Sequence, residues 1–166
     1  MKKFIYILIM PLVLLIGLGF ANSEIKTEKT AAMKKWESTR DGMFFKKWEA
    51  SPAGKKVYAS EAKIRKSIKD YTNMEGVVTS LSLPTGARLG FGVMARINGD
   101  DYILAFGVDS KKEFEQLHTL KVNDKIIIKS HSVSHAPKYA FPIVAGDYVE
   151  RDSKIMFKRV PRKGGC

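Results

Sequence analysis

The sequence predicts an α+β protein that is mainly β, with five strands, one helix between the third and fourth strands, and a basic helical arm before them. Three observations carry this prediction. Side chains alternate between apolar and other types through residues 91–97, which is the period of a half-buried strand. Asn98-Gly99 follows directly and is a strong hairpin signal, because both residues tolerate a positive φ. Ser110 and Glu113 have the spacing of a helix capping box.

The composition is that of one globular domain with a real core. The chain has 166 residues, 45% hydrophobic and 28% charged, and its formal net charge is +12. This charge makes anionic partners favourable but says nothing about the fold. The only cysteine, Cys166, is the last residue, so the chain cannot form an internal disulfide. We assign it no role.

The first segment has the pattern of a secretory signal. Two lysines precede an apolar run from Phe4 to Phe20, which ends in the small residues Ala21 and Ser23. We expect residues 1–23 to be removed after Ser23, with Ala21 as the competing position, and the product to be exported to a bacterial cell envelope or periplasm. The alternative is a retained membrane tether, since the run is near the lower length limit for a spanning helix.

Residues 24–71 are predicted to form the basic helical arm. One helix is expected over residues 31–40, capped by Thr30 and ended by Asp41-Gly42. A second is expected from Pro52 to Lys69, because Ser51 can cap it and proline suits the first helical position. Residues 24–69 hold 13 basic and 6 acidic side chains, against 14 and 11 in residues 70–166.

Lysines and tryptophans alternate in this arm, a pattern typical of membrane-surface helices and of nucleic-acid-binding arms. The alternative is that the aromatic rings pack against the sheet domain while the lysines are merely solvated. We expect peripheral membrane contact, where it occurs, to involve residues 31–48. The candidate contacts to an anionic surface are Lys34, Lys35, Trp36, Lys46, Lys47 and Trp48.

Residues 72–160 are predicted to form the sheet domain, followed by a tail at 161–166. The expected strands are residues 74–83, 91–97, 102–106, 125–131 and 148–157. The helix that begins after Ser110 lies between the third and fourth strands.

The strand order and one turn carry a family resemblance. A helix between the third and fourth of five strands is the layout of the OB-fold barrel. Residues 120–129 (LKVNDKIIIK) are also similar to the Leu-x-x-Gly-Asp-x-Val-x-Val stretch of such barrels, with Asn123 in place of glycine. The domain therefore resembles the OB-fold superfamily, in particular the tRNA-anticodon-binding-like group, which implies a five-stranded barrel. The competing arrangement is a meander sheet packed on the long helix.

The resemblance also implies where a ligand would bind. OB barrels bind their ligands on strands two and three and the adjoining loops. On that face and its loops the candidate ligand-binding residues are Arg88, Met94, Arg96, Tyr102, Lys138 and Tyr139. Few aromatic side chains are available there, and export removes the usual nucleic-acid partners, so nucleic acid is possible but not favoured.

Catalytic and cofactor motifs are missing from the sequence. We find no Gly-x-Ser-x-Gly, no His-Glu-x-x-His and no phosphate-binding loop. His131 and His135 would lie on one face if the fourth strand continued, but a metal site needs at least one more ligand. We therefore expect no cofactor or metal. We expect an exported, non-enzymatic module that binds a protein or an anionic envelope component. The alternatives are an extracytoplasmic single-stranded nucleic-acid binder and an unrecognised hydrolase.

Overall fold

The computed structural model describes residues 30–108 and 110–160, and these divide into two compact units between Trp48 and Glu49. The predicted signal sequence and Cys166 lie outside the described residues. Residues 30–37 are helical and precede the helices α2 (Arg40–Ala50) and α3 (Pro52–Lys69). In the part of the chain that the structure describes, no helix is long and apolar enough to cross a bilayer.

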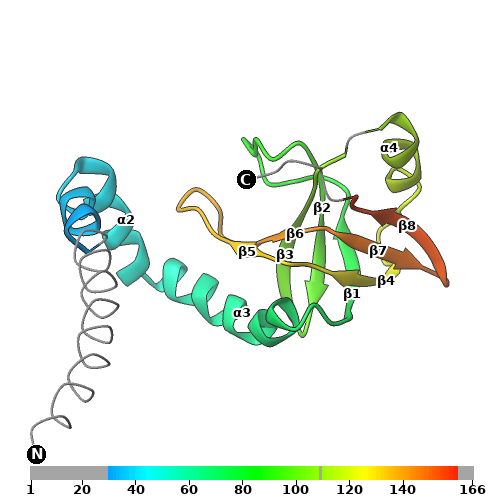
Figure 1. Cartoon of the computed structure of the whole chain (residues 1–166), viewed down its shortest axis with the longest axis horizontal. Coiled ribbons are helices and arrows are strands. Elements are labelled where there is room, and N and C mark those ends of the chain that lie inside the picture. The colour runs from blue at the N-terminus through cyan, green and yellow to red at the C-terminus, as the bar shows by residue number, and fades with distance from the viewer. Residues whose placement is uncertain (1–29, 109, 161–166) are drawn as a thin grey trace, which may run out of the picture. The chain divides into compact units, whose positions relative to one another are not determined.

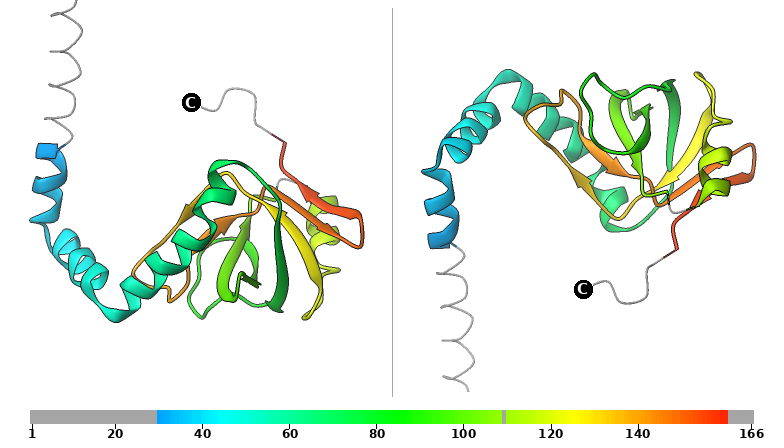
Figure 2. Two further views of the ribbon diagram at one scale, coloured as in Figure 1. Left: turned by 90° about the horizontal axis from the view of Figure 1, so that it is seen from below. Right: turned by 90° about the horizontal axis from the view of Figure 1, so that it is seen from above.

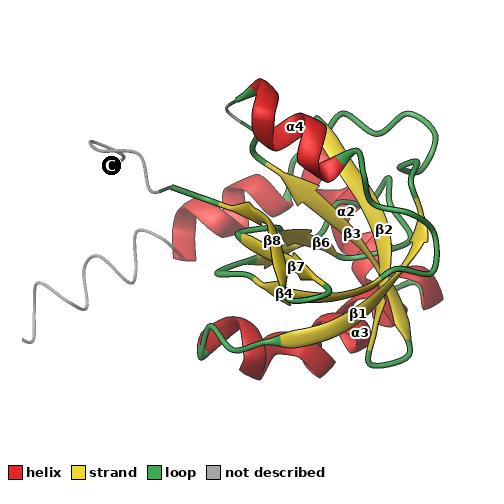
Figure 3. Ribbon diagram, turned by 90° about the vertical axis from the view of Figure 1, so that its right-hand side faces the viewer, coloured by secondary structure: helices red, strands yellow, loops and turns green. Residues whose placement is uncertain are grey.

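The second unit is a mixed α+β fold built on one eight-stranded sheet (Figure 1). Its elements in chain order are β1 (Met74–Ser80), β2 (Phe91–Ile97), β3 (Asp100–Phe106), α4 (Lys111–Leu117), β4 (Lys125–Lys129), β5 (Val133–Ser134), β6 (Ile143–Ala145), β7 (Tyr148–Arg151) and β8 (Lys154–Lys158). Helix α3 lies against β5 and helix α4 against β8, at opposite ends of the sheet (Figures 1 and 3).

The strands are ordered β5-β6-β3-β2-β1-β4-β7-β8, and the sheet is open. The predicted barrel of five strands is therefore not confirmed, although α+β with mostly strands is. All neighbours are antiparallel except β3 and β6, which run parallel. Only Gly146 and Asp147 separate β6 from β7.

Two local predictions were wrong. Asp41 and Gly42 do not end a helix but lie inside α2, whose start is capped by the Thr39 hydroxyl, which accepts a hydrogen bond from the Gly42 N–H at 3.1 Å. The predicted last strand is a hairpin of β7 and β8. Asp152 and Ser153 form its turn, with φ values of 51° and 61°, and two positive φ values match the twist of a two-residue hairpin.

Other local signals gave the predicted elements. Ser51 caps α3 through the Gly54 N–H at 3.1 Å, and Ser110 and Glu113 form the capping box of α4. Asn98 and Gly99 join β2 to β3 with φ values of 50° and 84°. These matches follow because each signal is a local hydrogen bond or backbone preference that needs no distant partner.

The core lies on the inner face of the sheet. Helix α3, predicted as part of the arm, contributes Ile64 and Ile68, and α4 contributes Leu117. Tyr102 faces the same core, and its hydroxyl donates to the Ser60 carbonyl of α3 at 2.7 Å. The last turns of α3 are therefore fixed to the sheet by both apolar packing and a buried hydrogen bond.

Candidate functional site

The outer face of β2 and β3, where the OB resemblance implies a ligand, is covered by the chain's own loops. Met94 and Ile103 project from this face, and Tyr139 of the loop between β5 and β6 packs against them, so that all three are buried. Other members of this outer cluster include Leu83, Ala87, Leu89, Ala136 and Phe141 from the two flanking loops. The face thus presents no exposed aromatic ring among the described residues on which a base could stack.

The other predicted ligand-binding residues do not converge on one exposed site. Arg96 forms a two-pronged ion pair with Asp101, with contacts of 3.0 and 3.2 Å. Tyr102 faces the inner core. The Arg88 N–H donates to the Tyr139 hydroxyl at 3.3 Å, and the Lys138 ammonium lies 4.7 Å from the Tyr139 ring centroid and lowers the pKa of that hydroxyl. These contacts hold the loops over the outer cluster.

The arm presents apolar and basic side chains together. Met33, Trp36, Met43 and Phe44 are exposed by 42–63%. The candidate contacts Lys34, Lys35, Lys46 and Lys47 are exposed as well, whereas Trp48 is buried. Large apolar side chains in water are costly unless they meet a partner or a membrane, so this surface is a candidate interaction site.

A tight turn holds the two helical segments of the arm together (Figure 2). The Trp36 ring packs edge-on against Phe45, with centroids 5.6 Å apart, and Lys46 pairs with Glu37 at 3.2 Å. Gly42 is buried at the crossing, where an added Cβ would lie 2.2 Å from the Trp36 carbonyl oxygen. Only glycine therefore allows this close approach.

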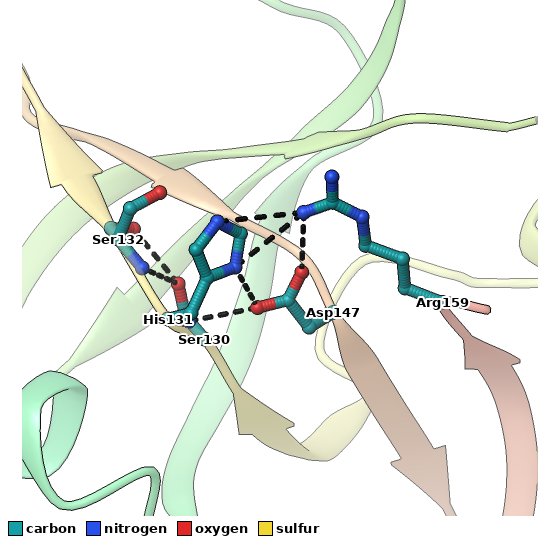
Figure 4. Close-up of polar contacts among 5 residues, drawn as sticks. All are labelled: Ser130, His131, Ser132, Asp147 and Arg159. Carbon is teal, nitrogen blue, oxygen red and sulfur yellow. Dashed lines mark hydrogen bonds and ion pairs between the residues drawn. The ribbon is translucent and has the colours of Figure 1, made fainter. Parts of the chain in front are cut away.

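A polar cluster that the sequence did not predict surrounds Asp147, between β6 and β7 (Figure 4). The Asp147 side chain is 5% exposed. Its Oδ2 atom accepts from the His131 backbone N–H at 2.7 Å and contacts Nδ1 of the same residue. Its Oδ1 atom accepts from Arg159 Nη1 at 3.2 Å. The carboxylate thus orients one imidazole and one guanidinium, both about half exposed.

The neighbouring serines do not make this cluster a nucleophilic site. Ser130 Oγ donates to the Ser132 carbonyl at 2.8 Å and accepts from its N–H at 3.2 Å. Arg159 Nη1 lies 3.4 Å from Nε2 and 3.5 Å from Nδ1 of His131, so the guanidinium rests against the ring. The histidine therefore faces a cation and not a hydroxyl.

Two tyrosines and a lysine lie next to the Asp147 cluster. The Lys129 ammonium is 5.8 Å from the Tyr71 ring centroid and 5.7 Å from that of Tyr148. Burial, and then the charge of Asp147, raise the pKa of the Tyr71 hydroxyl, while Arg159 lowers it. Tyr71, Lys129 and Arg159 therefore belong to one surface.

His135 takes part in a different network, so the two predicted histidines do not act together. Its Nδ1 atom lies 2.6 Å from Oε1 of the buried Glu61, and its Nε2 atom lies 3.1 Å from the Tyr58 hydroxyl. That hydroxyl donates to Glu49 at 2.5 Å. Burial, then the hydrogen bond to Glu49, raises the pKa of Tyr58 to about 12. This network ties α3 to the segment after β5.

Metal chemistry finds no support in the part of the chain described here, where no three His, Cys, Asp or Glu side chains gather as a ligand set. Comparison with known proteins adds nothing further: no family model, no curated protein and no solved structure matches the chain.

Proposed function

We propose that this chain is an exported, non-enzymatic binding module that attaches to an anionic component of the cell envelope, namely a membrane surface containing acidic phospholipid. The observation that carries the proposal is the arm, where exposed Met33, Trp36, Met43 and Phe44 stand among exposed lysines. Apolar side chains that enter the interface and cations that meet lipid phosphates act together in such helices.

The charges of the arm favour an acidic surface. Within residues 30–48, the basic side chains are Lys34, Lys35, Arg40, Lys46 and Lys47, against Glu37 and Asp41. Glu37 is paired with Lys46 and so offers less repulsion. Each lysine near an acidic membrane contributes about 1 kcal/mol to binding.

The predicted signal segment that precedes the arm is consistent with a position at the membrane surface. The predicted signal segment ends at Ser23, and only residues 24–29 separate it from the part of the arm at residues 30–48 that carries the exposed side chains. Cleavage would release the module into the envelope, where the arm would bind the membrane reversibly. Retention of the segment would hold the arm at the same surface. In both cases residues 30–48 would be able to reach a membrane surface.

We also propose that the second unit is an OB-like barrel. Strand β6 pairs with β3, and β7 pairs with β4. Because two residues separate β6 from β7, they can be regarded as one bent fifth strand that joins the third strand to the fourth. Gly146 supports the bend, since an added Cβ there would lie 2.4 Å from the Phe106 ring.

Co-sedimentation with lipid vesicles tests the proposed function. The protein should bind vesicles containing phosphatidylglycerol and bind phosphatidylcholine vesicles weakly. Replacing Lys34 and Lys35 by glutamine should weaken binding by about 2 kcal/mol, or about thirtyfold. The matched control replaces the exposed neighbours Lys111 and Lys112 of α4 by glutamine and should change little.

Met43→Ser with Phe44→Ser tests the apolar part of the arm and should weaken binding without changing its salt dependence. Equal losses in the lysine variant and its control would contradict the proposal. Tighter binding to a single-stranded oligonucleotide than to acidic vesicles would favour the nucleic-acid alternative instead.

A further inference from the structure

We propose that the second unit carries a separate site for a phosphate group, formed by Arg159, Lys129 and the Tyr71 hydroxyl around the buried Asp147. The site does not depend on the membrane-binding residues 30–48, since all of its residues belong to the unit that begins at Glu49. It therefore adds a second anionic ligand to the membrane contact proposed above.

The first element of the site is an arginine that is already positioned. Arg159 is held at both ends by Asp147: its backbone N–H donates to the Asp147 carbonyl at 2.7 Å, and its Nη1 reaches Oδ1 at 3.2 Å. Its Nε and Nη2 donors have no partner in the described chain. The side chain is 52% exposed. Little further ordering is then needed for these donors to meet an oxyanion.

The second element is a lysine without a counter-ion. The Lys129 ammonium lies between the rings of Tyr71 and Tyr148, and no carboxylate of the described residues pairs with it. The nearby Glu150 accepts a hydrogen bond from Tyr148 Oη at 2.5 Å. Two rings hold the ammonium in place without neutralising its charge, and this favours an external anion.

The third element is a hydroxyl donor. Tyr71 follows α3 with a φ of 50° and is 46% exposed. Its hydroxyl forms no hydrogen bond within the described chain. Burial, and then the charge of Asp147, raise the pKa of this hydroxyl, while Arg159 lowers it. The bend of the backbone after α3 thus accompanies a phenol ring whose centroid lies 5.8 Å from the Lys129 ammonium.

Asp147 does not oppose an incoming anion strongly, because both of its oxygens are engaged and its side chain is buried. Its role is to position Arg159 and His131. Donors from three elements, namely the end of α3, strand β4 and the segment after β8, suit an oxyanion with several acceptor oxygens. A phosphate monoester, free or in a lipid headgroup, is the ligand class that we infer.

Titration calorimetry with inorganic phosphate and with glycerol 3-phosphate tests the site. Both ligands should bind the wild-type chain at low ionic strength. Arg159→Gln and Lys129→Gln should each weaken binding by at least about tenfold, since a hydrogen bond to a charged group is lost. Tyr71→Phe removes one exposed donor without disturbing the core and should weaken binding severalfold.

The controls are Arg96→Gln and Lys125→Gln. Arg96 is paired with Asp101, and Lys125 lies at the opposite end of β4 from Lys129, so neither change should alter phosphate binding. Circular dichroism monitors folding of every variant. Absence of heat with both ligands, no effect of Arg159→Gln and Tyr71→Phe, or equal effects of the controls would overturn the proposal.

Vesicles containing phosphatidic acid, tested with the Lys34→Gln, Lys35→Gln variant, distinguish the two sources of the phosphate. Binding that is lost on Arg159→Gln assigns the site to a lipid headgroup. Binding of soluble monoesters alone assigns it to a free phosphorylated compound. The assay uses a variant whose arm lacks Lys34 and Lys35. The effect of Arg159→Gln on vesicle binding can therefore be interpreted even if the arm does not bind membranes.

Discussion

Gly42→Ala should disrupt the arm although it replaces a poor helix former with the best one. In an isolated helix this change stabilises by about 1 kcal/mol. Here the new Cβ would lie 2.2 Å from the Trp36 carbonyl oxygen and 2.6 Å from the Glu37 Cα atom. Both are backbone atoms and cannot rotate away, so the two helical segments must separate.

The expected cost is the sum of several contacts. Separation would weaken the Trp36–Phe45 ring contact, about 0.5–1.5 kcal/mol, and strain the Thr39 cap, about 1 kcal/mol. After the gain in helix propensity is subtracted, we expect a net loss of about 0.5–1.5 kcal/mol of arm stability. Short helices are marginal alone, so this loss should unfold part of α2.

Tryptophan signals provide the assay, because both tryptophans of the chain, Trp36 and Trp48, lie in the arm. Near-ultraviolet circular dichroism of tryptophan should decrease in Gly42→Ala, and its thermal transition should occur at lower temperature. The control is Gly107→Ala, where an added Cβ meets nothing within 4 Å. An unchanged tryptophan signal with a higher melting temperature would refute the close-approach argument.

Three further changes test the second unit. Tyr102→Phe should cost about 1 kcal/mol in urea unfolding, because the Ser60 carbonyl loses a buried donor at 2.7 Å. Gly146→Ala should cost about 1–3 kcal/mol in the same assay, because the new Cβ would meet the buried Phe106 ring at 2.4 Å. Hydrogen bonding from Lys63, and then from Ser60, lowers the pKa of Asp100 below its ordinary value of 3.8. That contribution is present above pH 3.8 and is lost as the pH falls through the lower folded-state pKa, so Asp100→Asn should flatten the stability curve there. At neutral pH the variant should lose less than about 1 kcal/mol, since Lys63 is half exposed.

Each of these tests has a clear contrary result. Full stability of Tyr102→Phe would mean that the helix-to-sheet hydrogen bond contributes nothing. A neutral Gly146→Ala would mean that the Phe106 ring can move aside. An acid unfolding profile of Asp100→Asn that matches the wild type would show that its carboxylate is not coupled to folding.

Local chemistry explains which elements the sequence could predict. The caps at Ser51 and Ser110 and the turn at Asn98-Gly99 involve residues a few positions apart, and all formed as expected. Asn123, predicted as a substitute for glycine, has a φ of 74°. The turn at Asp152-Ser153 was missed because it has no glycine, although both residues have positive φ.

The candidate sites could not be predicted, because they depend on contacts between residues that are distant in the sequence. Asp147 contacts residues 16 positions before it and 12 after it, and no short motif records that pairing. Gly42 was predicted to end a helix. Its role in the structure is to let α2 pack closely against the Trp36 backbone, and the sequence alone does not show that contact. The burial of Met94 and Tyr139 likewise depends on two loops that fold over one face. Long-range partners of this kind cannot be read from spacing.

The outer cluster has a consequence for the order in which the sheet opens. Strands β2 and β3 are covered by the inner core on one side and by the outer cluster on the other. Their amide protons should therefore be among the slowest to exchange with solvent. Strand β5, with two residues at the end of the sheet, should exchange early. The last part of the unit to open would then be the hairpin of β2 and β3, whose two strands are joined by the Asn98-Gly99 turn.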